Sequence, residues 1–203
     1  MKHSELVRAL ATVSEFHEPR ADLEQLSVSP EAAAQLLELA LARDDLMDRS
    51  VLDLGSGTGR LAIGSALLGA SPVVGIEIDP GPVAVARESG ERLGVTVDFV
   101  EQGVEGCTQR AQTVVMNPPF GAQRAHADRP FWEAAFSLAD RAVYAFALEP
   151  SRSFIERRAV AHSARVVERR PVRWRLARTL PHHRKPAREV AVDLYAFETG
   201  RER

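Results

Sequence analysis

The sequence predicts an α/β fold, in which a doubly wound, mostly parallel sheet of seven strands ends in an antiparallel hairpin. Three observations lead to this prediction. Short apolar runs alternate along the 203 residues with segments of helical period. The helical segments are roughly 10 to 15 residues long, the length of helices that connect parallel strands. After residue 150, two long strand-like segments follow each other across a polar loop.

The predicted elements can be justified in chain order from the spacing of apolar residues. Runs rich in Val, Ile and Leu predict strands at residues 50–55, 71–78, 95–100, 112–117 and 141–148. Apolar residues three or four positions apart predict helices at residues 29–44, 60–69, 80–94, 129–140 and 151–164. The hairpin is predicted from residues 165–178 and 189–199, with the polar loop 179–188 between them.

The length suits one domain, and we expect an N-terminal extension over residues 1–29 and a single α/β domain over residues 30–203. The first 20 residues mix charges of both signs, which is typical neither of a signal peptide nor of a membrane span. Cys107 is the only cysteine, which excludes an intrachain disulfide and a cysteine-based zinc site. We therefore expect a cytoplasmic protein without a metal site.

Charge is distributed unevenly, although the net charge of the whole chain is only −2. Residues 151–203 hold 13 Arg and one Lys against six acidic residues, a balance of +8 that leaves −10 for residues 1–150. Such an asymmetry favours a nucleic-acid contact in the last quarter of the chain. The alternative is that these guanidinium groups lie on solvated faces and bind nothing.

A glycine-rich stretch, VLDLGSGTGR, lies where the first predicted strand meets the next helix. Gly55, Gly57 and Gly59 allow a sharp turn and let a ligand approach the backbone at the helix N-terminus. Asp53 precedes the glycines, and an acid there fits a ligand with a positively charged amino group. Glu77, at the end of the second strand, is placed to accept hydrogen bonds from ribose hydroxyls. We predict that this loop binds S-adenosylmethionine, the alternative being an ordinary glycine turn.

The stretch TVVMNPPFGAQ ends the fourth strand with Asn117, Pro118, Pro119 and Phe120. Ligands of open α/β sheets bind beyond the carboxyl ends of the strands, so these residues are expected beside the glycine loop. The side-chain oxygen of Asn117 and the carbonyl oxygen of Pro118 can accept the two N–H bonds of a planar amino group. The prolines fix the backbone, and Phe120 can stack on the ring that carries the nitrogen.

This arrangement predicts methylation of an amino nitrogen. Hydrogen bonds accepted from the amine favour the positive charge that develops on nitrogen, so no strong general base is needed. We expect in-line attack on the sulfonium methyl, with the proton lost late to water. The alternative is a strand that merely stops at two prolines, followed by a core phenylalanine.

The two motifs together resemble the class I methyltransferases that modify amino groups, at adenine N6 or at glutamine N5. The finer resemblance is to the archaeal and eukaryotic N6-adenine rRNA methyltransferases of the methyltransferase-like-five type, whose eukaryotic members act on small-subunit rRNA. It extends over the chain from about residue 16, and implies a Rossmann-like class I methyltransferase domain over residues 30–203. The stretches that carry it are FHEPRADLEQ, VLDLGSGTGRLAIGSALLGASPVVGIEID, VVMNPPFGAQ and HHRKPAREVAVDLYAF.

The resemblance also implies the residues of the site. Acceptor contacts are implied at residues 117–120. Cofactor contacts are implied at Gln25, Gly55, Gly57, Thr58 and Glu77.

The sequence departs from the family pattern in two places. Leu26 and Val28 follow LEQ, where the family usually has an aromatic and a hydroxyl residue. Gly103 replaces an Asp that recognises the adenine amino group of the cofactor, which leaves Val104 to pack on the adenine. Residues that can substitute for this Asp are Glu101, Gln102 and Glu105.

The third predicted strand, at residues 95–100, lies at the sheet edge in the strand order usual for such folds. Val95, Val97 and Phe99 are expected on one face of it, and Val100 adds apolar surface. An uncovered apolar edge invites pairing with another chain. The resemblance implies such a partner, a small zinc-binding activator protein. The alternative is a strand that is covered by its own helices.

The predicted hairpin contains the basic stretch RRPVRWRLARTLPHHRKPAR. Its arginines suit phosphate groups, and Trp174 can either stack on an unpaired base or lie in the core. His182 and His183 fit phosphate neighbours better than metal ligands. His126, in GAQRAHADRP, is a further candidate for a substrate contact.

These inferences describe a cytoplasmic enzyme that methylates N6 of an adenosine in structured RNA, and we expect this RNA to be small-subunit rRNA. Two alternatives stay open. A glutamine-N5 methyltransferase of a protein such as a release factor also needs two acceptors for a planar NH₂ group. An RNA-binding module without catalytic activity can keep the same fold. The basic tail and the LEQ stretch favour RNA, and the intact residues 117–120 favour an enzyme.

Overall fold

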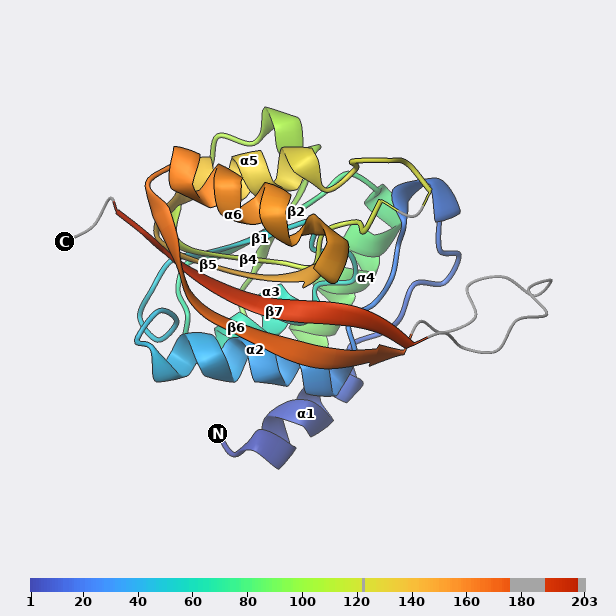
Figure 1. Cartoon of the computed structure of the whole chain (residues 1–203). Helices are drawn as coiled ribbons and strands as arrows, with labels where there is room; N and C mark the ends of the chain where they lie inside the picture. The colour runs from blue at the N-terminus through green and yellow to red at the C-terminus, as the bar shows by residue number, and fades with distance from the viewer. Residues whose placement is uncertain (122, 176–188, 201–203) are drawn as a thin grey trace.

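The computed structural model describes residues 1–121, 123–175 and 189–200, except for the side chains of residues 173–175 and 189–190. Over these residues the chain forms one seven-stranded sheet with helices on both faces (Figure 1). The strands are β1 (Val51–Leu54), β2 (Val73–Glu77), β3 (Asp98–Glu101), β4 (Ala111–Met116), β5 (Ala139–Leu148), β6 (Ala164–Arg175) and β7 (Glu189–Thr199). The helices are α1 (His3–Ala11), α2 (Pro30–Ala42), α3 (Arg60–Leu67), α4 (Pro80–Arg92), α5 (Arg129–Leu138) and α6 (Arg152–Ala161).

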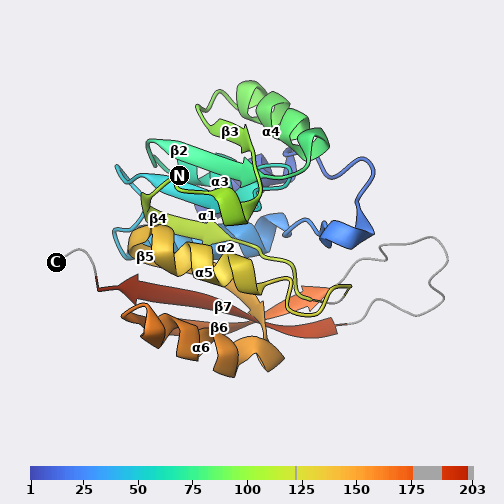
Figure 2. The same cartoon turned by 90° about the horizontal axis from the view of Figure 1, so that it is seen from above.

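The strand order β3-β2-β1-β4-β5-β7-β6 confirms the predicted doubly wound sheet (Figure 2). β1 pairs in parallel with β2 and β4, and the parallel part extends to β3 on one side and β5 on the other. β7 is antiparallel to both β5 and β6, so the predicted hairpin adds to the sheet through its second strand. The strand order changes direction at β1 and β4, which is the position where such sheets bind ligands.

Two layers of helices enclose the sheet. α1, α2, α3 and α4 cover one face, and α5 and α6 cover the other (Figure 1). The first layer buries Leu6 and Leu10 of α1 together with the apolar faces of α2 and α3. The second layer buries the rings of Trp132, Phe136 and Phe197. Side chains of β1 and β4 alternate between these two cores, as buried parallel strands require.

Local signals start the helices at the expected places. The Ser29 hydroxyl accepts from the Ala32 N–H at 3.2 Å, and Pro30 occupies the first turn of α2. Asp79 caps α4 in the same way by accepting from the Gly81 N–H at 3.0 Å, with Pro80 following. Both are favoured combinations of an N-cap residue and a first-turn proline.

The structure corrects the predicted third strand, which is shorter and is covered differently than expected. β3 begins at Asp98, because the chain is still turning away from α4 at Val95, whose N–H donates to Gly90 O at 3.1 Å. β3 lies at the sheet edge as predicted. However, Val95, Val97 and Phe99 pack against the core beneath α4 and do not form an open apolar face.

α1 is an element that the sequence analysis did not predict. It packs on α2 and α3, so the N-terminal segment shares the core of the sheet domain. None of the helices in the described parts of the chain is both long and apolar enough to cross a membrane.

Candidate active site

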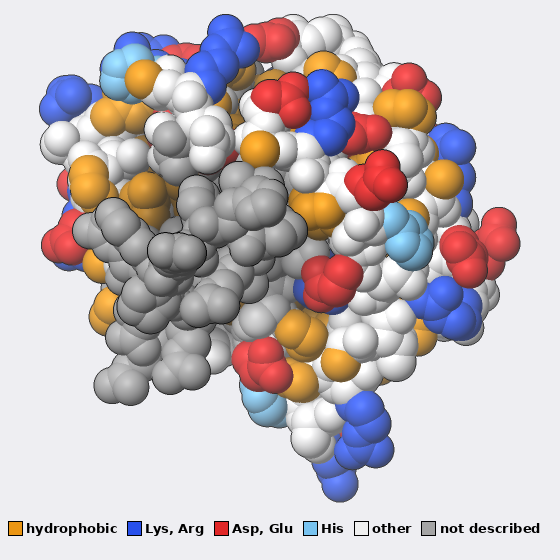
Figure 3. Space-filling model, turned by 90° about the vertical axis from the view of Figure 1, so that its right-hand side faces the viewer, with side chains coloured by type: hydrophobic (Ala, Val, Ile, Leu, Met, Phe, Trp, Pro, Cys, Tyr) orange, Lys and Arg blue, Asp and Glu red, His pale blue; other side chains and the backbone are white. Residues whose placement is uncertain are grey.

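A cavity of about 500 Å³ lies at the carboxyl ends of β1, β2 and β4. This size falls in the range of roughly 300–1,000 Å³ that is typical of small-molecule sites. The strand ends point to the right in Figure 1 and therefore toward the viewer in Figure 3, where acidic and basic side chains are interspersed on the coloured surface. The predicted site residues that line the cavity are Gln25, Asp53, Gly55, Gly57, Thr58, Glu77, Val104, Asn117 and Pro119.

The glycine loop after β1 is shaped by two close aromatic rings. Gly55 and Gly57 have φ angles of 69° and 53°, in the left-handed region that favours glycine. A Cβ at Gly55 would lie 2.7 Å from Phe131 Cε1, and a Cβ at Gly57 would lie 2.8 Å from Phe16 Cζ. Phe16 and Phe131 also line the cavity. The sequence analysis missed both rings, because each reaches the loop from a distant part of the chain.

Asp53 has one committed and one free carboxylate oxygen. Its Oδ2 accepts from the Ala62 N–H at 3.0 Å, a main-chain donor in the first turn of α3. Its Oδ1 is buried and has no hydrogen-bond partner among the described residues. Burial raises the pKa of Asp53 to about 7, the nearby charge of Glu77 adds to this, and the Ala62 N–H opposes it. A cationic ligand group beside Oδ1 would restore the carboxylate form.

Glu77 connects the glycine loop to the end of β2. Its Oε2 accepts from the Gly57 N–H at 2.9 Å, and its Oε1 accepts from the Asp79 N–H at 3.0 Å. Burial raises the pKa of Glu77, although these two N–H groups act in the opposite direction. The carboxylate thus sits at the cavity wall, where the sequence analysis expected a ribose contact.

Gln25 joins the N-terminal segment to the same wall. Its Oε1 accepts from the Arg20 N–H at 2.7 Å, and its Nε2 donates to Asp79 Oδ2 at 2.8 Å. Because Asp79 lies two residues after the end of β2, this bond holds the N-terminal segment beside the part of the cavity that Glu77 lines. This segment carries Leu26 and Val28, at which the sequence departs from the family pattern; both line the cavity.

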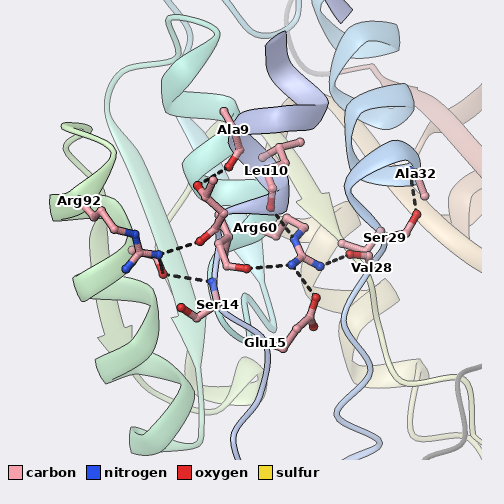
Figure 4. Close-up of polar contacts among 12 residues, drawn as sticks. Ala9, Leu10, Ser14, Glu15, Val28, Ser29, Ala32, Arg60 and Arg92 are labelled. Atoms are coloured by element: carbon pink, nitrogen blue, oxygen red, sulfur yellow. Dashed lines mark hydrogen bonds and ion pairs between the residues drawn. The ribbon is translucent and has the colours of Figure 1, made fainter. Parts of the chain in front are cut away.

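Arg60 lies between Leu10, Glu15 and Val28 of the N-terminal segment and holds them together, as Figure 4 shows. Only 4% of this residue is exposed. Its guanidinium donates to the main-chain oxygens of Leu10 at 3.2 Å, Val13 at 3.0 Å and Val28 at 2.5 Å, and to Glu15 Oε1 at 2.7 Å. A buried arginine with its donors satisfied by carbonyl groups holds those carbonyls in one arrangement. Arg60 lies directly after the glycine loop, yet no local pattern in the sequence shows where it binds.

Asn117 presents a free acceptor to the cavity. Its Nδ2 donates to Leu26 O at 3.1 Å. This bond fixes the orientation of the amide, and Oδ1 is buried with no hydrogen-bond partner among the described residues. An acceptor left in this state is what a substrate N–H would satisfy.

The three residues after Asn117 have different environments. Pro118 is buried, and Pro119 is partly buried and lines the cavity. Phe120 is partly buried and packs against the core on the α2 side; it is not among the cavity-lining residues. His126 lines the cavity and is exposed, with a left-handed φ of 67°.

Unsatisfied polar atoms gather in this cavity. Within the described part of the chain, the buried side-chain oxygens that lack a partner belong to Ser27, Asp53, Ser56 and Asn117, and all four residues line it. Buried polar atoms are normally hydrogen-bonded, so such a group indicates a missing polar ligand. The acid, the free amide oxygen and the apolar walls fit a ligand with an amino group and a flat ring. Ser27 is a hydroxyl that the sequence analysis passed over.

The loop after β3 carries Gly103, where the family pattern has an Asp that recognises the cofactor's adenine. Its position shows which neighbouring residues can take over that contact. Gln102, Gly103, Val104 and Glu105 line the cavity, whereas Glu101 is not among the lining residues. Val104 is 9% exposed and packs in the core on the α5 side. The Gln102 amide donates to Gly106 O at 2.5 Å.

Many arginines of residues 151–203 already have acidic partners. Arg152 pairs with Asp193 at 2.5 Å, Arg158 with Glu133 at 2.5 Å, and Arg169 with Glu156 at 3.6 Å. Arg165 and Arg170 likewise pair with Glu198 and Glu168. The positive balance of residues 151–203 is therefore partly neutralised on α6 and on the hairpin. The side chain of Trp174 and the whole of His182 and His183 lie outside the described residues, as do Arg178, Arg184, Lys185 and Arg188.

Comparison with known proteins shows a consistent pattern. The family model described as ribosomal protein L11 methyltransferase matches residues 33–118, which contain the glycine loop and end inside the Asn-Pro-Pro-Phe motif. Over the full chain, the rRNA N(6)-adenosine-methyltransferase Mettl5 of Drosophila melanogaster is 33% identical, and 99% of that protein is covered. The corresponding protein of Danio rerio is 32% identical, with 97% of this chain and 99% of that protein covered. A crystal structure of a proposed RNA methyltransferase from Pyrococcus horikoshii superimposes with a TM-score of 0.90, at 36% identity over 98% of both chains.

Proposed function

Since the chain belongs to the rRNA N6-adenosine methyltransferase family, we propose that its cavity places the N6 amino group of an rRNA adenosine at Asn117, beside the cofactor. The enzyme transfers a methyl group from S-adenosylmethionine to N6 of an adenosine in RNA. The observation that carries the placement is the buried Oδ1 of Asn117, which has no partner among the described residues while its Nδ2 is held by Leu26 O.

S-adenosylmethionine supplies an electrophilic methyl group when it is bound. We assign its amino group to the free Oδ1 of Asp53, its ribose to Glu77, and its adenine to Val104, with Gln102 or Glu105 as acceptor of the adenine amino group. The main chain at Gly55, Gly57 and Thr58 and the Gln25 segment enclose it. These assignments are supported by the common lining of one cavity and by the unsatisfied oxygens there.

On the acceptor side, two oxygens orient the amino group. Asn117 Oδ1 and the Pro118 carbonyl accept its two N–H bonds, which directs the nitrogen lone pair and favours positive charge on nitrogen. Pro119 keeps the backbone in place, and Phe120 anchors the loop by packing on the core. The proton is lost to water, so no side chain needs to act as a strong base.

We further propose small-subunit rRNA as the substrate and the cytoplasm as the place of action. Residues 1–29 then act as an extension that completes the active site of the methyltransferase domain, residues 30–203. Support for the extension comes from Gln25 and from the carbonyls of Leu10, Val13 and Val28 that Arg60 holds.

A small zinc-binding activator protein is the proposed partner, adding a strand beside β3. Among the described strands, β3 pairs only with β2, so its other side offers backbone groups. Because Val95, Val97 and Phe99 face the core, such a partner would bind through main-chain hydrogen bonds more than through an apolar face. Arg87 of α4 already donates to Phe99 O, one of the main-chain oxygens of β3, at 2.6 Å.

The partner can be tested by co-expression of the two proteins. A higher yield of folded enzyme and purification of a 1:1 complex would support this partner. A monomer with unchanged yield would oppose it.

The function can be tested by label transfer. Methyl-labelled S-adenosylmethionine is incubated with extract from a strain that lacks the gene, together with wild-type protein or Asn117→Ala, and nucleosides and amino acids are analysed by mass. We expect N6-methyladenosine in small-subunit rRNA with the wild type and none with Asn117→Ala. Label in another RNA would overturn the small-subunit assignment. Label in protein glutamine would transfer the site to glutamine-N5 chemistry, and no label would indicate a non-catalytic RNA-binding module.

A further inference from the structure

One carboxylate from the N-terminal segment binds the backbone of the acceptor loop. Glu24 Oε2 accepts from the Phe120 N–H at 2.8 Å. Glu24 Oε1 accepts from the Gln123 N–H at 2.8 Å and from the Arg124 N–H at 3.4 Å. Both oxygens are therefore used, and the contacts span 96 to 100 positions of sequence.

The backbone of Glu24 is held in an uncommon conformation. It ends a short 3₁₀ turn over Ala21–Leu23 with φ 51° and ψ 40°, in the left-handed region that non-glycine residues rarely adopt. Residues held in this way cluster at functional sites, where surrounding contacts maintain them. Here the contacts are the Glu24 N–H to Ala21 O at 3.0 Å and the three N–H groups on its carboxylate.

Glu24 also belongs to three consecutive residues that each hold a different wall of the cavity. Glu24 holds the loop after Phe120, Gln25 holds Asp79 at the end of β2, and Leu26 O holds Asn117. The cofactor side and the acceptor side are thus connected through one tripeptide.

The loop that Glu24 binds has little regular structure of its own. Gly121 and His126 both have positive φ angles, of 76° and 67°, and α5 begins only at Arg129. The N–H groups of residues 120, 123 and 124 have a shared external acceptor in Glu24. Acceptance of several main-chain N–H bonds by one carboxylate is a strong, charge-assisted arrangement.

We propose that Glu24 is a positioning residue that holds the acceptor loop in its reactive arrangement by accepting these backbone N–H bonds. The inference rests on the proposed function in so far as the loop is the acceptor side of a methyl-transfer site. Glu24 lines the same cavity. Both of its carboxylate oxygens are taken up by main-chain N–H groups, so it acts on the site through Phe120 and its neighbours.

Glu24→Gln is the test variant, because it keeps the size of the side chain and removes one of the two acceptor oxygens. An NH₂ group then faces at least one main-chain N–H, so the loop loses part of its support. Glu18→Gln is the matched control, since Glu18 is an exposed glutamate of the same segment. Glu24→Asp is the second variant, which keeps both oxygens on a side chain shorter by one methylene.

Three quantities are measured on full-length protein. Amide hydrogen exchange, followed by mass spectrometry, should rise about tenfold over residues 120–124 in Glu24→Gln. The kcat for rRNA methylation should fall by about 100-fold, because a displaced acceptor loop loses orientation. The dissociation constant of S-adenosylmethionine, measured by calorimetry, should stay within about threefold of the wild type. Glu24→Asp should give intermediate exchange and partial recovery of kcat, and Glu18→Gln should match the wild type.

Unchanged exchange over residues 120–124, or a wild-type kcat in Glu24→Gln, would overturn the inference. A uniform rise in exchange over the whole chain of both Glu24 variants would also overturn it, since that result shows a general role in stability. If the wild type methylates no RNA, the proposed function fails, and the exchange comparison alone then decides the role of Glu24.

Discussion

The amide nitrogen of Asn117 donates to the main-chain oxygen of Leu26 at 3.1 Å, across 91 positions of sequence. This one bond decides which end of the Asn117 amide faces the cavity. With the nitrogen committed, Oδ1 is left as a buried acceptor. The departure at Leu26 therefore does not remove the polar function of this position, because the contact uses its main chain.

Asn117→Asp tests the orienting bond. The change replaces the Nδ2 donor with an oxygen, which would then face Leu26 O in a partly buried site and repel it. We expect kcat for RNA methylation to fall by about 100-fold or more, the scale seen when one oriented hydrogen-bonding group is lost from an active site. Calorimetry should show cofactor binding within about threefold of the wild type. An active Asn117→Asp enzyme would contradict the assignment of the acceptor site.

Asp53 should make the stability of the ligand-free protein depend on pH. Because its pKa in the folded state is raised to about 7, the folded protein retains a proton that the unfolded chain has already released above its ordinary pKa of about 4. The free energy of unfolding therefore falls as pH rises through this window. Between pH 5.5 and 7.5 the loss attributable to Asp53 should be about 2 kcal/mol.

Urea unfolding at the two pH values, on wild type and Asp53→Asn, measures this contribution. Other titrating groups act on both proteins, so the difference between them isolates Asp53. The variant should lose about 2 kcal/mol less than the wild type over the interval. Equal pH dependence in both proteins would show that Asp53 is ionised throughout.

Gly57→Ala should weaken cofactor binding, whereas the same substitution at a glycine outside the site should not. The added Cβ would lie 2.8 Å from Phe16 Cζ, at a φ of 53°. Gly94→Ala is the matched control, because Gly94 has a φ of 68° but nothing within 4 Å of the added Cβ. Both variants should lose roughly 1–2 kcal/mol of stability from the left-handed backbone. Only Gly57→Ala should also weaken S-adenosylmethionine binding, by about tenfold, as measured by calorimetry.

Arg60→Met should destabilise the protein strongly. The substitution keeps an unbranched apolar side chain but removes the guanidinium donor from the carbonyls of Leu10, Val13 and Val28. We expect a loss of about 3–5 kcal/mol in urea unfolding, the range for breaking a buried charged network. Arg92→Met is the control, since Arg92 also donates to the N-terminal segment, at Thr12 O (Figure 4). In contrast to Arg60, its side chain is 42% exposed. Its loss should be below about 1 kcal/mol, and equal losses would contradict the role of Arg60.

Local patterns explain why much of the fold and site could be predicted. β1, β2, β4 and β5 are apolar runs bounded by turn residues, and Asp53 and Asn117 sit at fixed offsets from two of them. Since parallel strands bring their carboxyl ends together, placing the strands also places these side chains in one cavity. α1 carries a usable but overlooked signal, the helical spacing of its buried residues Leu6 and Leu10.

Other parts of the site depend on contacts that no local pattern encodes. Glu24 is an ordinary surface-type residue by composition, and only the fold brings it to Phe120. Phe131 reaches Gly55 in the same way, from the first turn of a helix that follows β4. The same reason explains β3, where an apolar pattern predicted the strand but did not reveal that its side chains would face the core.

The insertion of β7 between β5 and β6 has a consequence for synthesis on the ribosome. β5 is complete at Leu148, but its antiparallel neighbour ends only at Thr199, about 50 residues later. At roughly 5–20 residues per second, the backbone edge of β5 stays unpaired for some 3 to 10 seconds. β5 carries Val143, Tyr144 and Phe146, which are fully buried once folding is finished. β6 is made first, yet it reaches the sheet only through β7. A nascent chain paused in this interval would expose an unpaired strand edge together with apolar side chains. A chaperone that binds at this stage would keep that strand from pairing with another chain.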